Sequence, residues 1–196
     1  MLFQGQEFLE GGSFSDTVPV DRDQCEAFYG IVKLYSDLIG LRLNRKGFTR
    51  GLCGQHTQVY HLNDEQKVIA YHRWDKGGAA DDVVVIANFF RDPNDGYIIG
   101  FPAEVRRKLR FNSDGEGYND DFENHPRTDL LSTQGSYDGF ACPASVAIGS
   151  YSVLFFRNRH AAYHAHNKPP PNHGYVAINS KKSLFILRLP PSVLRT

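Results

Sequence analysis

Two neighbouring segments between Gln66 and Phe90 limit the possible folds of this sequence more than any other feature. The first segment alternates with period two, which is the pattern of a β-strand with two distinct faces. One face carries Val68, Ala70, His72 and Trp74, and the other carries Ile69, Tyr71 and Arg73. The second segment, residues 83–87, is a continuous apolar run and predicts a strand that is buried on both faces. An isolated hairpin of this kind is unstable in water, so further strands must cover it.

Short strands recur along the rest of the chain, with turn residues between them. The predicted strands are residues 57–62, 97–101, 105–111, 139–142, 145–148 and 151–156, and the predicted turns are residues 63–65, 75–82 and 93–96. Many short antiparallel strands joined by turns are typical of a β-sandwich or a Greek-key barrel. The predicted fold class is therefore mostly β, with an antiparallel β-sandwich preceded by one helix.

That helix is predicted over residues 23–43. Asp21, with Gln24 three residues on, has the spacing of a helix start, and apolar residues then recur at three- and four-residue intervals. The apolar stripe consists of Phe28, Ile31, Val32, Tyr35, Leu38 and Ile39. Because the stripe needs an apolar partner, we expect a chain that leaves part of it uncovered to be poorly soluble or to self-associate.

Charge and cysteine content argue against several classes of protein. Lys plus Arg balance Asp plus Glu at 22 each, so the net charge predicts neither nucleic acid nor a membrane as a partner. Cys25, Cys53 and Cys142 are an odd number without paired spacing, which argues against a disulfide framework and against zinc. We expect no secretory signal, because no positively charged region precedes the first apolar residues, and no apolar run reaches membrane length. We therefore expect a cytoplasmic protein with reduced thiols and no cofactor.

Residues 157–196 differ in character from the rest because they contain no acidic residue. Their histidines, His160, His164, His166 and His173, are compatible with a transition-metal site, but nothing else in the sequence supports one. Their basic residues are dispersed and are not interleaved with aromatic side chains, which argues against nucleic acid. We expect residues 184–189 to form at most one weak strand and the remainder to be disordered.

An ordered series of motifs resembles a known family. The motifs are MLFQGQEF, YSDLIGLRLN, QVYHLNDEQKVIAYHRW, DDVVVIANF, YIIGFP, KLRFNSDGEGY and IGSYSVLFF. Together they cover residues 1–156 and resemble the C-terminal part of an α-amylase or an α-glucan branching enzyme of glycoside hydrolase family 13. The resemblance implies that residues 1–50 are the last strand and last helix of a (β/α)₈ barrel. It also implies that residues 51–157 are the all-β domain that follows the barrel, and that residues 158–196 are a tail without a counterpart in the family.

The same resemblance implies a chain without catalytic activity of its own. The family's catalytic Asp, Glu and second Asp stand at the ends of other barrel strands, so they would precede Met1. Retaining hydrolysis needs two carboxylates on a rigid frame, and one strand and one helix supply no such frame. The expected function is to stabilise the barrel of an α-glucan-acting enzyme, and the alternative is a free-standing α-glucan-binding module. Only Gln6 and Glu7 would approach the substrate cleft, unless they are a polar pair that stabilises their loop.

Two aromatic residues are candidate sugar contacts. Flat amphipathic rings suit the faces of pyranose sugars, and Trp74 stands at a strand end beside a glycine turn, with Tyr71 on the same strand. Aromatic residues in strands more often belong to the core. His72 is expected to be a hydrogen-bonded structural residue. Asp81 and Asp82 are not expected to act as an acid/base pair, because adjacent side chains of an extended chain point in opposite directions.

Residues 112–123 have the spacing of a calcium-binding loop. Asn112, Asp114, Glu116, Asp120 and Glu123 occupy ligand positions of such a loop. The segment before it alternates as a strand rather than a helix, which excludes an EF-hand. Calcium binding of another kind stays open, but an ordinary acidic loop between strands is the expected interpretation, and no metal site is predicted.

Overall fold

The computed structural model describes residues 5–12, 15, 17–77, 81–102, 106–125, 128–158, 176–180 and 183–187. The chain divides into two compact units, Met1–Tyr163 and His164–Thr196. Residues 1–4, at the start of the expected last barrel strand, and the histidines of the tail lie outside the described residues.

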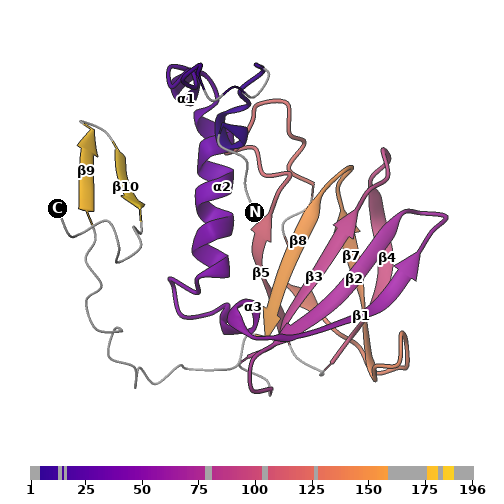
Figure 1. The fold of residues 1–196 in the computed structure, drawn as a ribbon. Coiled ribbons are helices and arrows are strands. Elements are labelled where there is room, and N and C mark those ends of the chain that lie inside the picture. The colour runs from indigo at the N-terminus through magenta and orange to yellow at the C-terminus, as the bar shows by residue number, and fades with distance from the viewer. Residues whose placement is uncertain are drawn as a thin grey trace. The chain divides into compact units, whose positions relative to one another are not determined.

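The first unit begins with helices and continues with strands (Figure 1). The helices are η1 (Gln6–Phe8), α1 (Gln24–Ala27), α2 (Tyr29–Arg42) and α3 (Arg50–Cys53). The strands are β1 (His56–Asn63), β2 (Val68–Trp74), β3 (Val83–Asn88), β4 (Asn94–Phe101), β5 (Arg106–Asn112), β6 (Leu130–Leu131), β7 (Cys142–Ile148) and β8 (Val153–Asn158). Every strand pair described is antiparallel, which confirms the predicted fold class.

Two sheets form the sandwich. One has six strands in the order β1-β2-β3-β8-β5-β6, and the other consists of β4 and β7 (Figure 1). Their facing side chains make one apolar core, because alternate residues of each strand point inward. The core contains Val68, Ala70, Val84, Ile86, Leu154 and Phe156 from the six-stranded sheet and Tyr97, Ile99, Phe101, Ala144, Val146 and Ile148 from the smaller sheet.

Strand β3 is buried on both faces, as its continuous apolar run predicts. Val84 and Ile86 belong to the core between the sheets, whereas Val83 and Val85 point to the opposite face of the six-stranded sheet. On that opposite face they meet a second apolar cluster that the helices cover. This helix cluster contains Leu41, Leu52, Val83, Val85 and Phe111, with Leu34, Leu38, Phe48, Tyr71, Tyr118, Val153 and Phe155 packed against it.

The predicted helix over residues 23–43 is interrupted. Phe28, at φ −111° and ψ 35°, leaves the helical region and separates α1 from α2. Leu34, Leu38 and Leu41 of α2 pack in the helix cluster, which fits their spacing of four and three residues. Much of the rest of the predicted stripe is not covered there, and Ile39 keeps 39% of its surface exposed.

Gly30 allows α2 to approach the sandwich closely. A Cβ atom at this position would collide with the backbone carbonyl of Tyr118, so no other residue fits without a shift of the backbone. The hydroxyl of Tyr118 also donates a hydrogen bond of 2.9 Å to the Asp37 carboxylate on the same helix. The helix is therefore held to the loop after β5 by a backbone contact and a side-chain hydrogen bond.

Two predictions about strands and turns were wrong in detail. Residues 139–142 and 145–148 are not two strands, because β7 runs without interruption from Cys142 to Ile148 after a tight turn over residues 137–140. Residues 93–96 are not a separate turn, because β4 begins at Asn94 and is irregular between Asn94 and Tyr97. The side chain of Asn94 accepts a hydrogen bond from the backbone N–H of Gly96 and shapes this irregular start.

The second unit contains a hairpin. Its strands are β9 (Val176–Ser180) and β10 (Ser183–Leu187), which pair antiparallel with Ser183 opposite Ser180. Strand β10 overlaps the weak strand predicted at residues 184–189 and begins one residue before it. The expectation of at most one strand in this tail was wrong, because β9 lies where none was predicted and pairs with β10. That residues 158–196 have no counterpart in the family stays a prediction.

Candidate functional site

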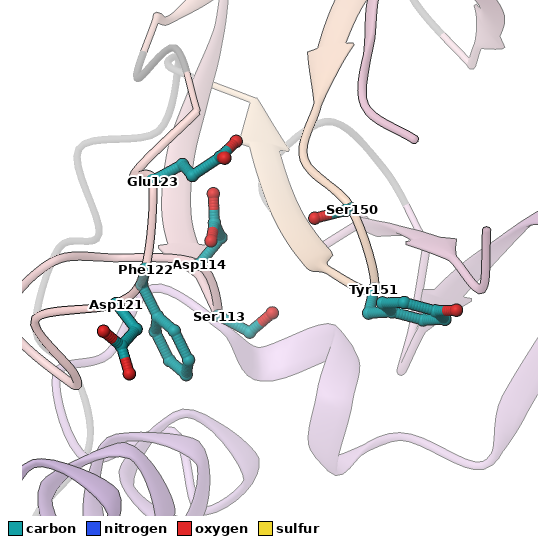
Figure 2. A pocket seen from close by; sticks show the side chains of 7 residues that line it. All are labelled: Ser113, Asp114, Asp121, Phe122, Glu123, Ser150 and Tyr151. Carbon is teal, nitrogen blue, oxygen red and sulfur yellow. The ribbon is translucent and has the colours of Figure 1, made fainter. Parts of the chain in front are cut away.

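A pocket of about 250 Å³ lies beside the start of β8 (Figure 2). It is lined by Ser113, Asp114, Asp121, Phe122, Glu123, Ser150 and Tyr151. These residues come from the loop that follows β5 and from the turn between β7 and β8. The pocket thus joins two segments that are separated in sequence.

Hydrogen bonds fix the loop side of this pocket. The Asp114 carboxylate accepts a hydrogen bond of 2.9 Å from the backbone N–H of His125, which closes the loop. The Ser113 hydroxyl accepts one of 2.8 Å from the backbone N–H of Val153 and ties the loop to β8. Further along the same loop, the His125 Nε2 atom lies 2.6 Å from an Asp95 carboxylate oxygen.

Tyr151 forms the other side of the pocket. Its backbone has φ 44°, a left-handed conformation that a residue with a bulky side chain seldom adopts. The buried Ser152 hydroxyl and the Asn88 side-chain amide both donate hydrogen bonds to the carbonyl of Gly149, at 2.8 and 2.9 Å. These bonds hold the turn in place while 71% of the surface of Tyr151 remains exposed.

The acidic residues of this loop do not form a metal site in the described part of the chain. There, no group of three or more His, Cys, Asp or Glu side chains is placed to hold an ion. Figure 2 shows the Asp121 carboxylate pointing away from those of Asp114 and Glu123. Among the described residues, the calcium spacing of residues 112–123 is not matched by a converging set of ligands, and the interpretation as an ordinary acidic loop stays a prediction.

Gln6 and Glu7 lie in the short helix η1. Gln6 is exposed, and Glu7 accepts a hydrogen bond of 3.1 Å from the backbone N–H of Gly5. The sequence analysis left two roles open for this pair, a sugar contact and stabilisation of the loop. The hydrogen bond from Gly5 is of the second kind. A role for these two residues in substrate binding stays a prediction.

Tyr71 and Trp74 lie on opposite faces of β2, as the alternation predicts. Tyr71 packs against the helix cluster, and its burial raises the pKa of its hydroxyl. The indole of Trp74 stacks on the rings of His56 and His72, with ring centroids 5.3 and 4.8 Å apart. The two aromatic residues therefore cannot form one common platform for a sugar.

A buried ion pair was missed by the sequence analysis. An Arg107 guanidinium nitrogen lies 2.7 Å from an Asp82 carboxylate oxygen, and the two side chains are only 0% and 7% exposed. The guanidinium also lies over the ring of Phe101, 5.2 Å from its centroid. The sequence could have indicated an inward-facing Arg107, because it stands two residues before Leu109 in the same strand, and residues two apart point to the same face.

The two adjacent aspartates have separate structural roles. Asp81 accepts hydrogen bonds from the backbone N–H groups of Asp75, Lys76 and Gly77 and so holds the turn between β2 and β3. Asp82 instead pairs with Arg107 in the core. This division agrees with the prediction that adjacent carboxylates of an extended chain do not face one bond.

His72 is half-buried, and it is not fully hydrogen-bonded, contrary to expectation. Among the described residues its Nε2 atom has no hydrogen-bond partner, and the nearest Asp82 oxygen is 3.9 Å away. Burial lowers the pKa of its imidazole, and the nearby Arg107 cation acts in the same direction. Asp82 and Asp81 oppose this shift without reversing it. His72 is thus a neutral structural residue.

Another histidine, His61, is buried and connects the two sheets. His61 on β1 places Nδ1 2.8 Å from an Asp138 carboxylate oxygen and Nε2 2.7 Å from the Tyr97 hydroxyl on β4. Burial raises the pKa of Tyr97, so its hydroxyl stays protonated and can donate to the imidazole. No spacing in the sequence indicated this network, because its three members lie on separate segments.

The fold and these contacts define the class of protein: an antiparallel β-sandwich domain with a helix packed on the outer face of its larger sheet. Residues 59–159 match the family described as "Alpha amylase, C-terminal all-beta domain". The match covers more than half of the chain, so the chain belongs to this family. The resemblance inferred from the ordered motifs is thereby confirmed.

Curated relatives extend this result. The chain is 31% identical over 120 residues to the 1,4-alpha-glucan branching enzyme GlgB of Photobacterium profundum, across 59% of this chain. It is 34% identical over 124 residues to the enzyme of the same name from Methylococcus capsulatus, across 60% of this chain. In both cases the chain spans only 16% of the relative's length. A solved pullulanase complexed with maltotetraose, from Anoxybacillus sp. LM18-11, is similar at TM-score 0.47 and 16% identity, over 78% of this chain and 20% of that one.

Within the described part of the chain, none of the helices has the length and apolar character required to cross a bilayer.

Proposed function

We propose that this chain works as the C-terminal all-β part of an α-glucan-acting enzyme, of the α-amylase or 1,4-α-glucan branching type, and that its role there is to stabilise rather than to catalyse. The observation that supports the proposal most strongly is the helix cluster. Through it, the helix that precedes the sandwich packs its leucines on the outer face of the larger sheet. By the resemblance, this helix is the last helix of the catalytic barrel.

The uncovered side of α2 supports a place within a larger assembly. Tyr29 is 63% exposed and Ile39 is 39% exposed, although both belong to an apolar helix. Exposed apolar surface of this kind marks sites of contact with other chains or domains. We propose that this side meets the rest of a catalytic barrel, and that the isolated chain self-associates through it.

The carboxylates favour a non-catalytic role. The two buried aspartates of the described residues, Asp81 and Asp82, are engaged in a turn and in an ion pair. A retaining glycosidase instead places two carboxylates about 5–5.5 Å apart across the scissile bond. The relatives named as branching enzymes extend far beyond the segment that matches this chain, so their activity is not transferred to it.

Incubation of the purified chain with amylose tests this proposal. We expect no change in iodine staining, which would report branching, and no new reducing ends, which would report hydrolysis. Turnover that is abolished by Glu7→Gln or by Asp114→Asn would overturn the proposal, because it would require an acid on this chain to take part in the reaction.

The alternative is a free-standing α-glucan-binding module, in which Trp74, Tyr71, Gln6 or Glu7 would contact the glucan. The half-exposed indole of Trp74 favours it. Retention on a glycogen affinity gel that is lost with Trp74→Ala would support this alternative, and the absence of retention would remove it. A cytoplasmic location also belongs to the proposal, and it is supported by the three cysteines, all of which are free.

A further inference from the structure

Three exposed aromatic residues lie in two loops that touch each other. Phe89 and Phe90 follow β3, and Tyr151 precedes β8. The backbone N–H of Tyr151 donates a hydrogen bond of 3.1 Å to the carbonyl of Phe90. The exposed fractions are 65% for Phe89, 38% for Phe90 and 71% for Tyr151. We call the two loops that carry these three residues the aromatic loops.

Hydrogen bonds link the backbones of the aromatic loops, although the aromatic side chains are exposed. The Asn88 side chain accepts a hydrogen bond from the N–H of Phe90 at 2.8 Å and donates one to the carbonyl of Gly149 at 2.9 Å. One buried amide therefore connects the two loops. A rigid aromatic surface loses little conformational entropy when a ligand binds.

The pocket beside Tyr151 supplies hydrogen-bond acceptors. Asp114, Asp121 and Glu123 line it together with the hydroxyls of Ser113 and Ser150, and no Lys or Arg is among its lining residues (Figure 2). An acidic lining repels anions such as phosphate, and among the described residues the carboxylates are not placed to hold a metal ion. A neutral ligand with many hydroxyl donors and an apolar face suits both the acceptors of the pocket and the exposed aromatic rings.

We propose that Tyr151, with Phe89 and Phe90, forms a contact site for an α-glucan chain, with one sugar ring on the Tyr151 ring and its hydroxyls directed to the carboxylates of the pocket. The choice of an α-glucan rests on the proposed function. The pocket, at about 250 Å³, is smaller than the roughly 300–1,000 Å³ of sites that enclose small molecules. It therefore suits one ring of a long chain that lies across the surface, and the binding is expected to be weak.

Titration of the 196-residue chain with maltoheptaose, followed by amide chemical shifts, tests the site. We expect shifts around residues 89–90 and 149–152, and about tenfold weaker binding for Tyr151→Ala. Tyr151→Phe keeps the ring and should bind as the parent chain does. Leu131→Ala is the matched control, because it removes an apolar side chain of similar exposure, 72%, from β6.

Three outcomes would overturn the site. They are no binding of maltoheptaose at concentrations of about 10 mM, unchanged binding by Tyr151→Ala, and shifts of the same residues on addition of calcium chloride alone. The β-linked cellohexaose should bind more weakly, and equal binding would refute the assignment to α-glucans. None of these outcomes bears on the stabilising role, which fails only if the chain turns over amylose or if the helix is not held by its cluster.

Discussion

Replacement of Phe111 by alanine tests how the helix is held to the sandwich. Phe111 is 5% exposed and lies in the helix cluster, with ring centroids 5.2 Å from Phe155 and 6.0 Å from Tyr118. Truncation of a buried phenylalanine costs about 3–5 kcal/mol, from lost apolar burial and from the cavity left behind. A pocket of about 240 Å³ already borders this ring, so water can enter the new space. We therefore expect the lower value, about 3 kcal/mol.

This loss is large against the whole stability of a domain, which is about 5–15 kcal/mol. For a chain of this size, 1 kcal/mol shifts the melting temperature by about 2–4 °C, so Phe111→Ala should lower it by about 6–12 °C. Far-UV circular dichroism reports the helices, and the fluorescence of the single tryptophan, Trp74, reports the sandwich. Because the cluster is the main apolar contact of α2, the circular dichroism signal of the helices should be lost at a lower temperature than the tryptophan fluorescence signal changes.

Leu62→Ala is the control, because Leu62 is 74% exposed on β1 and should change stability by no more than about 0.5 kcal/mol. If Phe111→Ala cost less than about 1 kcal/mol, or if both signals changed together with an unaltered midpoint, the helix cluster would not be what holds α2.

Three further predictions follow from the other contacts. Asp82→Asn removes the carboxylate partner of the buried Arg107 and should cost about 3–5 kcal/mol in urea denaturation, whereas a cost below about 1 kcal/mol would contradict a buried ion pair. The pKa of His72 lies below its ordinary value of 6.5 in the folded chain, so the unfolded chain binds the proton more readily. The contribution of His72 to the free energy of unfolding should therefore be complete above the ordinary pKa of 6.5 and should decrease as the pH drops below it. His72→Gln should flatten the change in urea midpoint between about pH 7.5 and about pH 5.5. An equally steep change in the variant would assign the pH dependence to other groups. Sedimentation of the chain should show concentration-dependent association that Ile39→Glu reduces, and a monomer at every concentration would contradict association through α2.

Local patterns in the sequence were sufficient for the strands of the large hairpin. The period-two residues of β2 and the apolar run of β3 lie where they were predicted, with β3 buried on both faces. Burial alternates along a strand because successive side chains point to opposite faces, so the faces can be read from neighbouring residues alone. The family resemblance rested on the same local information, read as an ordered series of motifs.

The orientation of the helix was not determined by its own sequence. Apolar residues surround much of α2, so periodicity alone does not choose between the row of Leu34, Leu38 and Leu41 and the side that carries Tyr29 and Ile39. The choice depends on which side chains fit the outer face of the sheet, and on the close approach that Gly30 permits. Both are properties of packing between distant segments.

The buried polar contacts and the proposed sugar site also required the tertiary structure. Arg107 and Asp82 are 25 residues apart, and the members of the His61 network lie up to 77 residues apart. Strand β8 pairs with β3 on one side and β5 on the other, and this pairing brings the acidic loop after β5 beside Tyr151. The sequence by itself determines which residues favour a strand, a turn or a buried face, because these depend on near neighbours. Only the folded chain decides which strands pair, and therefore which polar and aromatic side chains share one surface.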